Sequence, residues 1–244
     1  MRRRLSWYSE GLYSDEKATA GILFLPGRGG SGLHMLGFYK RVFELKDVAL
    51  MCLTPTPIEF GWYPMPNGAH DQSYACEGLK NASKALDDVL ANIETKFDLP
   101  REKIVVIGFS AGAVVGTHHF THFERPCAAM VSHSGAILEP DDLPQAGHSH
   151  PIILNHSQDD TCFEWHERYL PMKQALIRNG YKVKLAERAR GDHVMSYQDV
   201  ERLKPILESS LNITLKHASW INPDFDPDFD PDLDPDLDPD PVEN

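Results

Sequence analysis

A serine framed by small residues is the first feature of this chain that could do chemistry. Ser110 is the centre of the stretch GFSAG, residues 108–112, which follows the apolar run KIVVI and precedes AVVG. A G-x-S-x-G pattern alone is a weak signal, because glycine and serine are common residues. Between a strand and a helix it is far more specific, since a sharp turn there exposes the serine hydroxyl above a sheet. We therefore interpret Ser110 as a nucleophile and not as part of a plain strand-to-helix connection.

A serine hydroxyl is a poor nucleophile unless a base takes its proton and an acid orients that base. On a sheet of this kind the partners follow in the order serine, acid, histidine, each after a later strand. Asp159 and Asp160 come directly after the apolar run 151–157, and His193 lies in a short GDH loop after the alternating segment 181–189. The order predicts His193 as the base and leaves both aspartates open as the acid.

The negative oxygen that develops during attack on a carbonyl needs backbone N–H donors. The residue after the nucleophile, Ala111, supplies one such donor. The second is expected from the glycine-rich loop PGRGGSG, residues 26–32, where we assign the Arg28 N–H. A phosphate-binding loop is the alternative interpretation, but the Gly-Lys-Ser/Thr that such a loop requires is absent.

A second loop, residues 54–68, is rich in proline and aromatic residues. A large apolar loop near the expected site is suited to binding an acyl or aromatic group, with Trp62 and Tyr63 as the substrate contacts. A crossover stiffened by proline is an equally good interpretation. The sequence leaves the two open.

His118 and His122 lie one helical turn apart in THHFTH, a spacing that can chelate a metal. No third ligand is evident beside them, so we predict no metal site. Cys162, two positions beyond Asp160, is interpreted as a small packing residue and not as a nucleophile.

Short apolar runs alternate with longer amphipathic segments along the chain. The runs predicted as strands are 20–26, 48–55, 103–109, 127–135, 151–157 and 181–189. The segments predicted as helices are 33–47, 72–97, 111–123, 164–178 and 196–211. Strands that are apolar on both faces and alternate with helices predict an α/β protein with a mostly parallel central sheet and helices on each side.

The last residues differ from the rest in composition. Residues 222–244 contain nine Asp and one Glu but no Lys or Arg, in a repeat of Pro-Asp units. These acids account for most of the net charge of −12, so the remainder is nearly neutral and gives no reason to expect nucleic acid as a partner. Regular proline and dense charge predict a disordered tail at 222–244 after one folded domain at 1–221.

The four cysteines have no zinc or redox spacing, which favours a reducing compartment. The basic N-terminus lacks the apolar segment of a secretory signal, and no apolar run approaches the length of a membrane span. We therefore expect a cytoplasmic protein without an integral membrane segment.

The motifs together resemble those of α/β-hydrolases of the phospholipase/carboxylesterase group, which includes acyl-protein thioesterases. The resemblance covers residues 20–211 and rests on LPGRGGSG, GFSAG, HSQDD and the terminal GDH. It implies an α/β-hydrolase fold with no large cap domain, no cofactor and a small-molecule ester or thioester substrate. The chain departs from the group at Pro26, where histidine is usual, and at Ser157 and Thr161, where the acid loop usually has glycine and proline.

The acid loop of this group has its aspartate four residues after the histidine that ends the strand, and that position is Asp160. The rival positions are Asp159, which we expect to shape the turn, and Asp141 or Asp142 after the preceding strand. The predicted function is hydrolysis of carboxylic esters or thioesters through an acyl-enzyme. The alternatives are a hydrolase-like scaffold that binds a ligand without turnover, and an amide or peptide hydrolase. A monomer and a homodimer are both compatible with the sequence.

Overall fold

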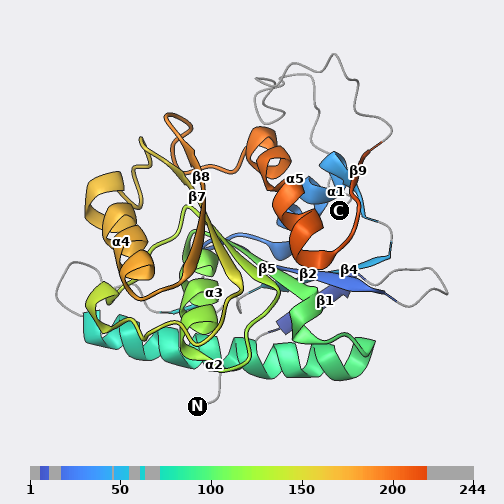
Figure 1. Cartoon of the computed structure of the whole chain (residues 1–244), viewed down its shortest axis with the longest axis horizontal. Helices are drawn as coiled ribbons and strands as arrows, with labels where there is room; N and C mark the ends of the chain where they lie inside the picture. Colours follow the sequence, from blue (N-terminus) through green and yellow to red (C-terminus); the bar gives the residue numbers. More distant parts are fainter. Residues whose placement is uncertain (1–5, 11–17, 46, 55–60, 64–71, 219–244) are drawn as a thin grey trace, which may run out of the picture.

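The computed structural model describes residues 6–10, 18–45, 47–54, 61–63 and 72–218 (Figure 1). The predicted tail at 222–244 and most of the loop at 54–71 lie outside these residues. The division into a domain at 1–221 and a tail therefore stays a prediction. Within the described residues, no helix is both long enough and apolar enough to span a bilayer.

A seven-stranded sheet in the order β1-β4-β2-β5-β6-β7-β8 forms the centre of the described part. Its strands are β1 (Ser6–Glu10), β2 (Ala20–Leu25), β4 (Val48–Thr54), β5 (Ile104–Phe109), β6 (Ala129–His133), β7 (Pro151–Ser157) and β8 (Lys182–Arg188). All neighbouring pairs from β4 to β8 are parallel, whereas β1 pairs with β4 in the antiparallel direction. The predicted α/β class with a mostly parallel sheet is confirmed.

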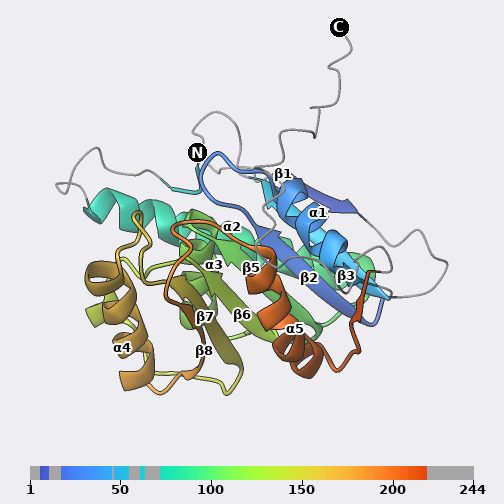
Figure 2. The same ribbon diagram turned by 90° about the horizontal axis from the view of Figure 1, so that it is seen from above.

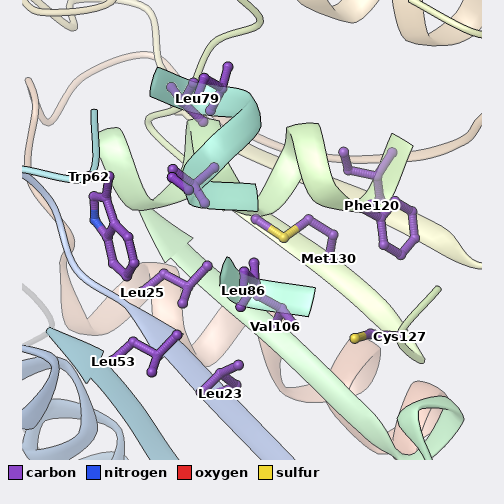
Figure 3. Close-up of a cluster of buried hydrophobic side chains, with 14 of the residues drawn as sticks. Leu23, Leu25, Leu53, Trp62, Leu79, Leu86, Val106, Phe120, Cys127 and Met130 are labelled. Atoms are coloured by element: carbon purple, nitrogen blue, oxygen red, sulfur yellow. The ribbon is translucent and has the colours of Figure 1, made fainter. Parts of the chain in front are cut away.

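Helices cover both faces of the sheet, as Figures 1 and 2 show from two directions. The helices α1 (Gly32–Val42) and α5 (Tyr197–Leu211) pack on one face, and α2 (Gln72–Phe97), α3 (Ala111–His122) and α4 (Leu170–Arg178) pack on the other. Successive side chains of β2 point to opposite faces of the sheet, and helices cover both faces, so its sequence is apolar throughout. Ile22 and Phe24 face α1 and α5, while Leu23 and Leu25 face α2 and α3 (Figure 3).

Three elements differ from the sequence-based expectation. The first is β1, whose sequence SWYSE has no apolar run and forms an edge strand through its pairing with β4. The second is α1, which ends at Val42 because the next two residues form β3 (Phe43–Glu44), paired with β9 (Lys216–His217). The third is the segment Trp165–Tyr169, a π-helix that leads into α4.

Four charged or titratable side chains form a cluster at the amino end of β5, called the basal cluster below: Asp87, Glu94, Arg101 and His119. Arg101 is nearly buried, and its guanidinium pairs with Asp87 and, at 2.8 Å, with the Glu94 carboxylate. The His119 Nε2 lies 3.1 Å from the same Asp87 oxygen that Arg101 contacts. The cluster joins α2, α3 and the residues before β5 at the end of the sheet away from Ser110.

Candidate active site

Ser110 occupies a strained turn between β5 and α3. Its φ is +52°, a left-handed value that is rare for residues other than glycine. The turn is fixed on both sides: the Ser110 N–H donates to the His133 carbonyl at 3.0 Å, and a Cβ on Gly112 would lie 2.1 Å from the Leu25 carbonyl oxygen. Glycine is therefore required at 112, because α3 begins in direct contact with the end of β2.

His193 joins Ser110 to Asp160 in a continuous series of hydrogen bonds. The His193 Nε2 lies 2.8 Å from the Ser110 Oγ, and its Nδ1 lies 2.9 Å and 3.0 Å from the two Asp160 oxygens. Because an ionised carboxylate only accepts, the proton of the neutral imidazole is on Nδ1, which leaves the Nε2 lone pair facing the serine hydroxyl. This is the arrangement in which imidazole can remove a proton from serine.

Asp160 is held in its ionised form. Burial by itself would raise the pKa of this carboxyl, which is 3% exposed. The hydrogen bonds from His193 and from the backbone N–H groups of Cys162 and Phe163, at 2.9 Å and 2.8 Å, outweigh burial and lower the pKa to about 2. The carboxylate is thus available to stabilise a positive charge on the imidazole.

Arg188, at the end of β8, organises the loop that carries His193. Its guanidinium pairs with the buried Asp199 at 2.6 Å and donates to the carbonyls of Val194 at 2.5 Å and Gly191 at 3.2 Å. Gly191 has a φ of +134°, and a Cβ there would lie 2.6 Å from the Arg188 guanidinium carbon. The loop that carries His193 has no regular secondary structure and is held by the Arg188 guanidinium, whose side chain is 8% exposed, and by its hydrogen-bond partners.

Two exposed aspartates link the acid loop to the histidine loop in opposite directions. Asp159 accepts the backbone N–H groups of Asp192 at 2.8 Å and Gly191 at 3.3 Å. Asp192 in turn accepts from the N–H and the hydroxyl of Thr161, at 3.1 Å and 2.8 Å. Asp159 therefore contacts the other loop instead of shaping only its own turn, and the loop pair fixes the distance between Asp160 and His193.

The expected oxyanion donors lie on two segments in contact with each other. Ala111 opens α3, and N–H groups in the first turn of a helix have no partner within it. The loop with Arg28 approaches closely, because a Cβ on Gly27 would lie 3.2 Å from the Ser110 Cβ. The Trp62 indole N–H donates to the Pro26 carbonyl at 2.7 Å and so holds the start of this loop.

Trp62 and Tyr63, the predicted substrate contacts, are 2% and 3% exposed and belong to the core on the α2 side (Figure 3 labels Trp62). Their role in substrate binding stays a prediction, since much of their loop lies outside the described residues. Cys162 is exposed, so its interpretation as a packing residue is wrong. Burial of its sulfur and the charges of Asp160 and Asp192 raise the pKa of this thiol, which does not favour a nucleophilic thiolate.

Other candidates named from the sequence lie in supporting positions or away from the serine. His156, the histidine near the end of β7, supports the acid loop, because its Nε2 donates to the Phe163 carbonyl at 2.8 Å. Asp141 pairs with Arg178 at 3.4 Å, and both Asp141 and Asp142 are exposed in a short turn beyond β6. Asp141 therefore contacts α4, and Asp142 lines a cavity beside α2 and α3, so neither was found at the His193 loop.

The rings of His118 and His122 stack at 4.0 Å beside a cavity of about 250 Å³ between α2, α3 and residues 137–142. Burial and the neighbouring His122 lower the pKa of His118 to about 3, so its imidazole is neutral. Among the residues that the structure describes, this pair gathers no third ligand for a metal. Elsewhere in the described residues, three potential metal ligands do lie close together: Asp160, Cys162 and His193.

The chain is similar to known hydrolases over most of its length. Residues 12–211 match the sequence profile of the phospholipase/carboxylesterase family. Esterase PE8 has 21% identity and a TM-score of 0.75, with 85% of this chain and 100% of that chain covered. A phospholipase/carboxylesterase from Dyadobacter fermentans has 19% identity and a TM-score of 0.71, with 85% and 98% covered. The Bacillus cereus carboxylesterase has 18% identity and a TM-score of 0.70, with 84% and 94% covered. These likenesses confirm the α/β-hydrolase fold.

Sequence reasoning missed the residues that hold the site together. Arg188 is one charge in the alternating segment of β8, and no local signal marks it as buried. The hydrogen bond from Trp62 to Pro26 joins residues 36 positions apart. A clue was available for Asp192, because an acidic residue directly before the histidine is well placed to contact the neighbouring loop.

Proposed function

The chain belongs to the phospholipase/carboxylesterase family and is a carboxylic ester hydrolase, and from this premise we propose that Ser110, His193 and Asp160 are its catalytic triad. The observation that carries the proposal is the unbroken series of hydrogen bonds from the Ser110 Oγ through both nitrogens of His193 to Asp160. The substrate class is a carboxylic ester or thioester, as in a carboxylesterase or lysophospholipase.

In the first half of the reaction, the Ser110 Oγ attacks the carbonyl carbon while the His193 Nε2 takes the hydroxyl proton. The oxyanion accepts hydrogen bonds from the N–H groups of Ala111 and Arg28. The imidazolium then gives the proton to the leaving alcohol or thiol, and an acyl-serine remains. In the second half, water attacks the acyl-serine with His193 again as the base, which releases the carboxylic acid.

The surroundings of His193 support this assignment. Charge develops on the imidazole during each attack, and the buried Asp160 carboxylate is its nearest anion at 2.9 Å. The same carboxylate selects the tautomer with a free Nε2. An acid held at a pKa of about 2 keeps its negative charge throughout the neutral range.

The proposal also covers the substrate contacts, the cellular location and the oligomeric state. Trp62 and Tyr63 stay proposed substrate contacts, and Trp62 has a further proposed part in fixing the Arg28 loop. The four cysteines all lie in the described residues and none of them forms a disulfide, which supports a cytoplasmic location. A homodimer stays compatible with the chain.

The test uses p-nitrophenyl esters of increasing acyl length, matched thioesters and p-nitroanilides, with a serine-directed fluorophosphonate as the probe. We expect hydrolysis of esters and thioesters, stoichiometric labelling of Ser110 found by peptide mapping, and loss of both in Ser110→Ala. Since the serine hydroxyl is a small group at a turn, Ser110→Ala should keep the melting temperature of the wild type.

Ester turnover by Ser110→Ala at a near wild-type rate would contradict the assignment of the nucleophile. Labelling of Ser110 without turnover of any substrate would favour a scaffold that binds but does not hydrolyse. Faster cleavage of the anilides than of the esters would favour an amide hydrolase on the same three residues.

A further inference from the structure

An exposed thiol lies beside the buried pair of Asp160 and His193. The Cys162 Sγ, an Asp160 carboxylate oxygen and a His193 ring nitrogen all lie within 4.8 Å of one another. The three come from different burial environments: Asp160 is buried, His193 is 15% exposed, and Cys162 faces solvent. A group that bridges them can therefore reach them from the solvent side.

The donor set is one that zinc prefers. Thiolate sulfur, imidazole nitrogen and carboxylate oxygen suit Zn²⁺ and softer ions such as Cd²⁺, whereas Mg²⁺ and Ca²⁺ take oxygen ligands. With bonds of about 2.0–2.3 Å, tetrahedral zinc ligands lie about 3.3–3.7 Å apart. The His193 Nδ1 and the Asp160 Oδ2 are 2.9 Å apart, so they need to separate only slightly, while the sulfur needs to approach by no more than about 1 Å.

The surroundings of Asp160 already provide the support that a metal-binding carboxylate needs. Its Oδ1 accepts the backbone N–H groups of Cys162 and Phe163, which fixes the orientation of the group. Its Oδ2 is the atom nearest to the His193 Nδ1 and is the one that would bind the ion. Hydrogen bonds that orient a metal-binding group in this way raise the affinity of the site for its metal.

We propose that Asp160, Cys162 and His193 form a zinc-binding site whose occupation inactivates the hydrolase, an inference that rests on the proposed triad. The Cys162 thiol loses its proton to solvent and binds as thiolate. The ion takes the position of the Nδ1 proton between His193 and Asp160, and the neutral imidazole then carries its proton on Nε2. Ser110 consequently faces an N–H donor in place of a base, and attack on the carbonyl stops.

The remaining cysteines make Cys162 a specific probe for this site. Cys52, Cys76 and Cys127 are buried, and Cys162 is the exposed member of the four. Metal binding that depends on an accessible thiol therefore reports on Cys162.

The experiment titrates the full-length wild type with buffered free Zn²⁺ while it hydrolyses a p-nitrophenyl ester, and repeats the titration with Cys162→Ser. Excess Mg²⁺ is present throughout to occupy carboxylates that bind cations weakly, including those of the acidic tail. His166→Ala is the matched control, because it removes an exposed potential ligand on the segment after the acid loop. Each variant is compared with its own rate in the presence of a chelator.

We expect Zn²⁺ to inhibit the wild type and His166→Ala equally, and a chelator to restore both. Loss of a direct ligand should weaken inhibition in Cys162→Ser by at least about 100-fold, since even second-sphere changes cost 10–100-fold in affinity. Cd²⁺ should produce a thiolate-to-metal absorption band in the ultraviolet with the wild type and not with Cys162→Ser.

The absorption titration needs no catalysis, so it keeps the two proposals distinguishable. If the wild type hydrolyses no ester but gives the Cys162-dependent Cd²⁺ band, the proposed triad fails while the metal-binding site stands. Equal inhibition of Cys162→Ser and wild type would overturn the site. Loss of inhibition in His122→Gln but not in Cys162→Ser would also overturn it, because the ion would then bind the histidine pair on α3.

Discussion

Two aspartate–histidine pairs lie at opposite ends of the β5–α3 unit, and their neighbours give them different chemistry. In the basal cluster, Asp87 contacts His119 and the Arg101 guanidinium at once. At the end with the proposed triad, Asp160 contacts His193 and two backbone N–H groups, and no arginine of the described residues contacts its oxygens. Each aspartate has a pKa of about 2, so both are ionised at neutral pH.

The difference lies in what else neutralises the carboxylate. Arg101 already balances Asp87, and burial lowers the pKa of His119, so this imidazole stays neutral and ties helices together. The His156 Nε2 also lies 3.7 Å from the Asp160 Oδ2, but burial lowers the pKa of His156, so its imidazole is neutral. Among the residues that the structure describes, the cation that Asp160 contacts is therefore the imidazolium that forms when His193 takes a proton. The same pair of residue types is structural in one place and suited to general base catalysis in the other.

The largest expected effect is the contrast between Asp160→Asn and Asp87→Asn. An amide at 160 would let His193 adopt the wrong tautomer, which can lower kcat by about 10⁴ in a triad of this kind. Asp87→Asn should leave kcat within about threefold and lower the free energy of unfolding by about 1–3 kcal/mol, because Arg101 loses a partner. Steady-state kinetics and thermal unfolding measure both. A comparable loss of kcat in Asp87→Asn would remove the distinction between the two pairs.

The arginines of the two regions should also separate activity from stability. Arg188→Gln releases the carbonyls that shape the His193 loop, and misplacement of a catalytic group by about 1 Å can cost about 100-fold in rate. We expect kcat to fall about 10–100-fold with little change in KM. Arg101→Gln should lower the melting temperature and leave kcat within about threefold.

Arg188→Lys is the conservative variant for this test, because it keeps the charge beside Asp199 but loses the planar fork. Compared with Arg188→Gln, this variant should return the melting temperature closer to the wild-type value than it returns kcat. If Arg188→Gln and Arg101→Gln each lower kcat in proportion to their loss of melting temperature, Arg188 has only a structural role.

A smaller effect is expected for Trp62→Phe. The phenyl ring still fills the core, but the Pro26 carbonyl loses the indole donor that fixes the start of the proposed oxyanion loop. We expect kcat to fall by up to about tenfold, or about 1.4 kcal/mol in the barrier. Tyr63→Phe is the matched control, and its kcat should fall by less than that of Trp62→Phe. Equal losses would indicate a general effect on the loop and not on Pro26.

Asp159→Asn should change kcat least among the aspartates after β7. The single amide oxygen can still accept the Asp192 N–H that Oδ1 of Asp159 accepts, whereas the Gly191 N–H loses its acceptor, Oδ2. The loops stay joined by the remaining hydrogen bond, so kcat should stay within about tenfold of the wild type. Asp142→Asn is expected within the same limit. A variant of Asp159 or Asp142 that is as impaired as Asp160→Asn would show that the orienting acid has been misassigned.

The pH dependence of stability gives the smallest expected signal. The side-chain hydrogen bond from His119 lowers the pKa of Asp87 to about 2, from about 3.8. A lowered pKa means that the unfolded state binds the proton first, so this stabilisation is complete above the unfolded value and is lost as pH falls through about 4 to 2. The unfolding free energies of wild type and Asp87→Asn, measured by urea titration, should therefore converge as the pH falls from 5 toward 2. A constant difference over this range would contradict the role of the ionised carboxylate.

Much of the fold could be predicted from the sequence, because strands and helices leave local patterns of apolar residues. Each strand predicted as an apolar run and each predicted amphipathic helix has a counterpart in the structure, with differences at its ends. The order of Ser110, the aspartates and His193 could also be read from the sequence, and their roles stay a proposal. The errors fall where pairing created structure, as in β1 and at the end of α1. No local pattern in SWYSE distinguishes an edge strand from a loop.

What the sequence by itself determined is the chemistry available: a serine in a strand-to-helix turn, two aspartates after β7 and a histidine in the loop after β8. What only the tertiary structure decided is how these groups are held. Asp160 meets His193 across 33 positions, and Asp159 meets Asp192 across the same distance in sequence. Neighbouring residues impose a turn or a strand through their own sterics, whereas a contact between distant loops depends on where the whole sheet places them. The position of the exposed Cys162 thiol beside Asp160 and His193 is also decided by the tertiary structure.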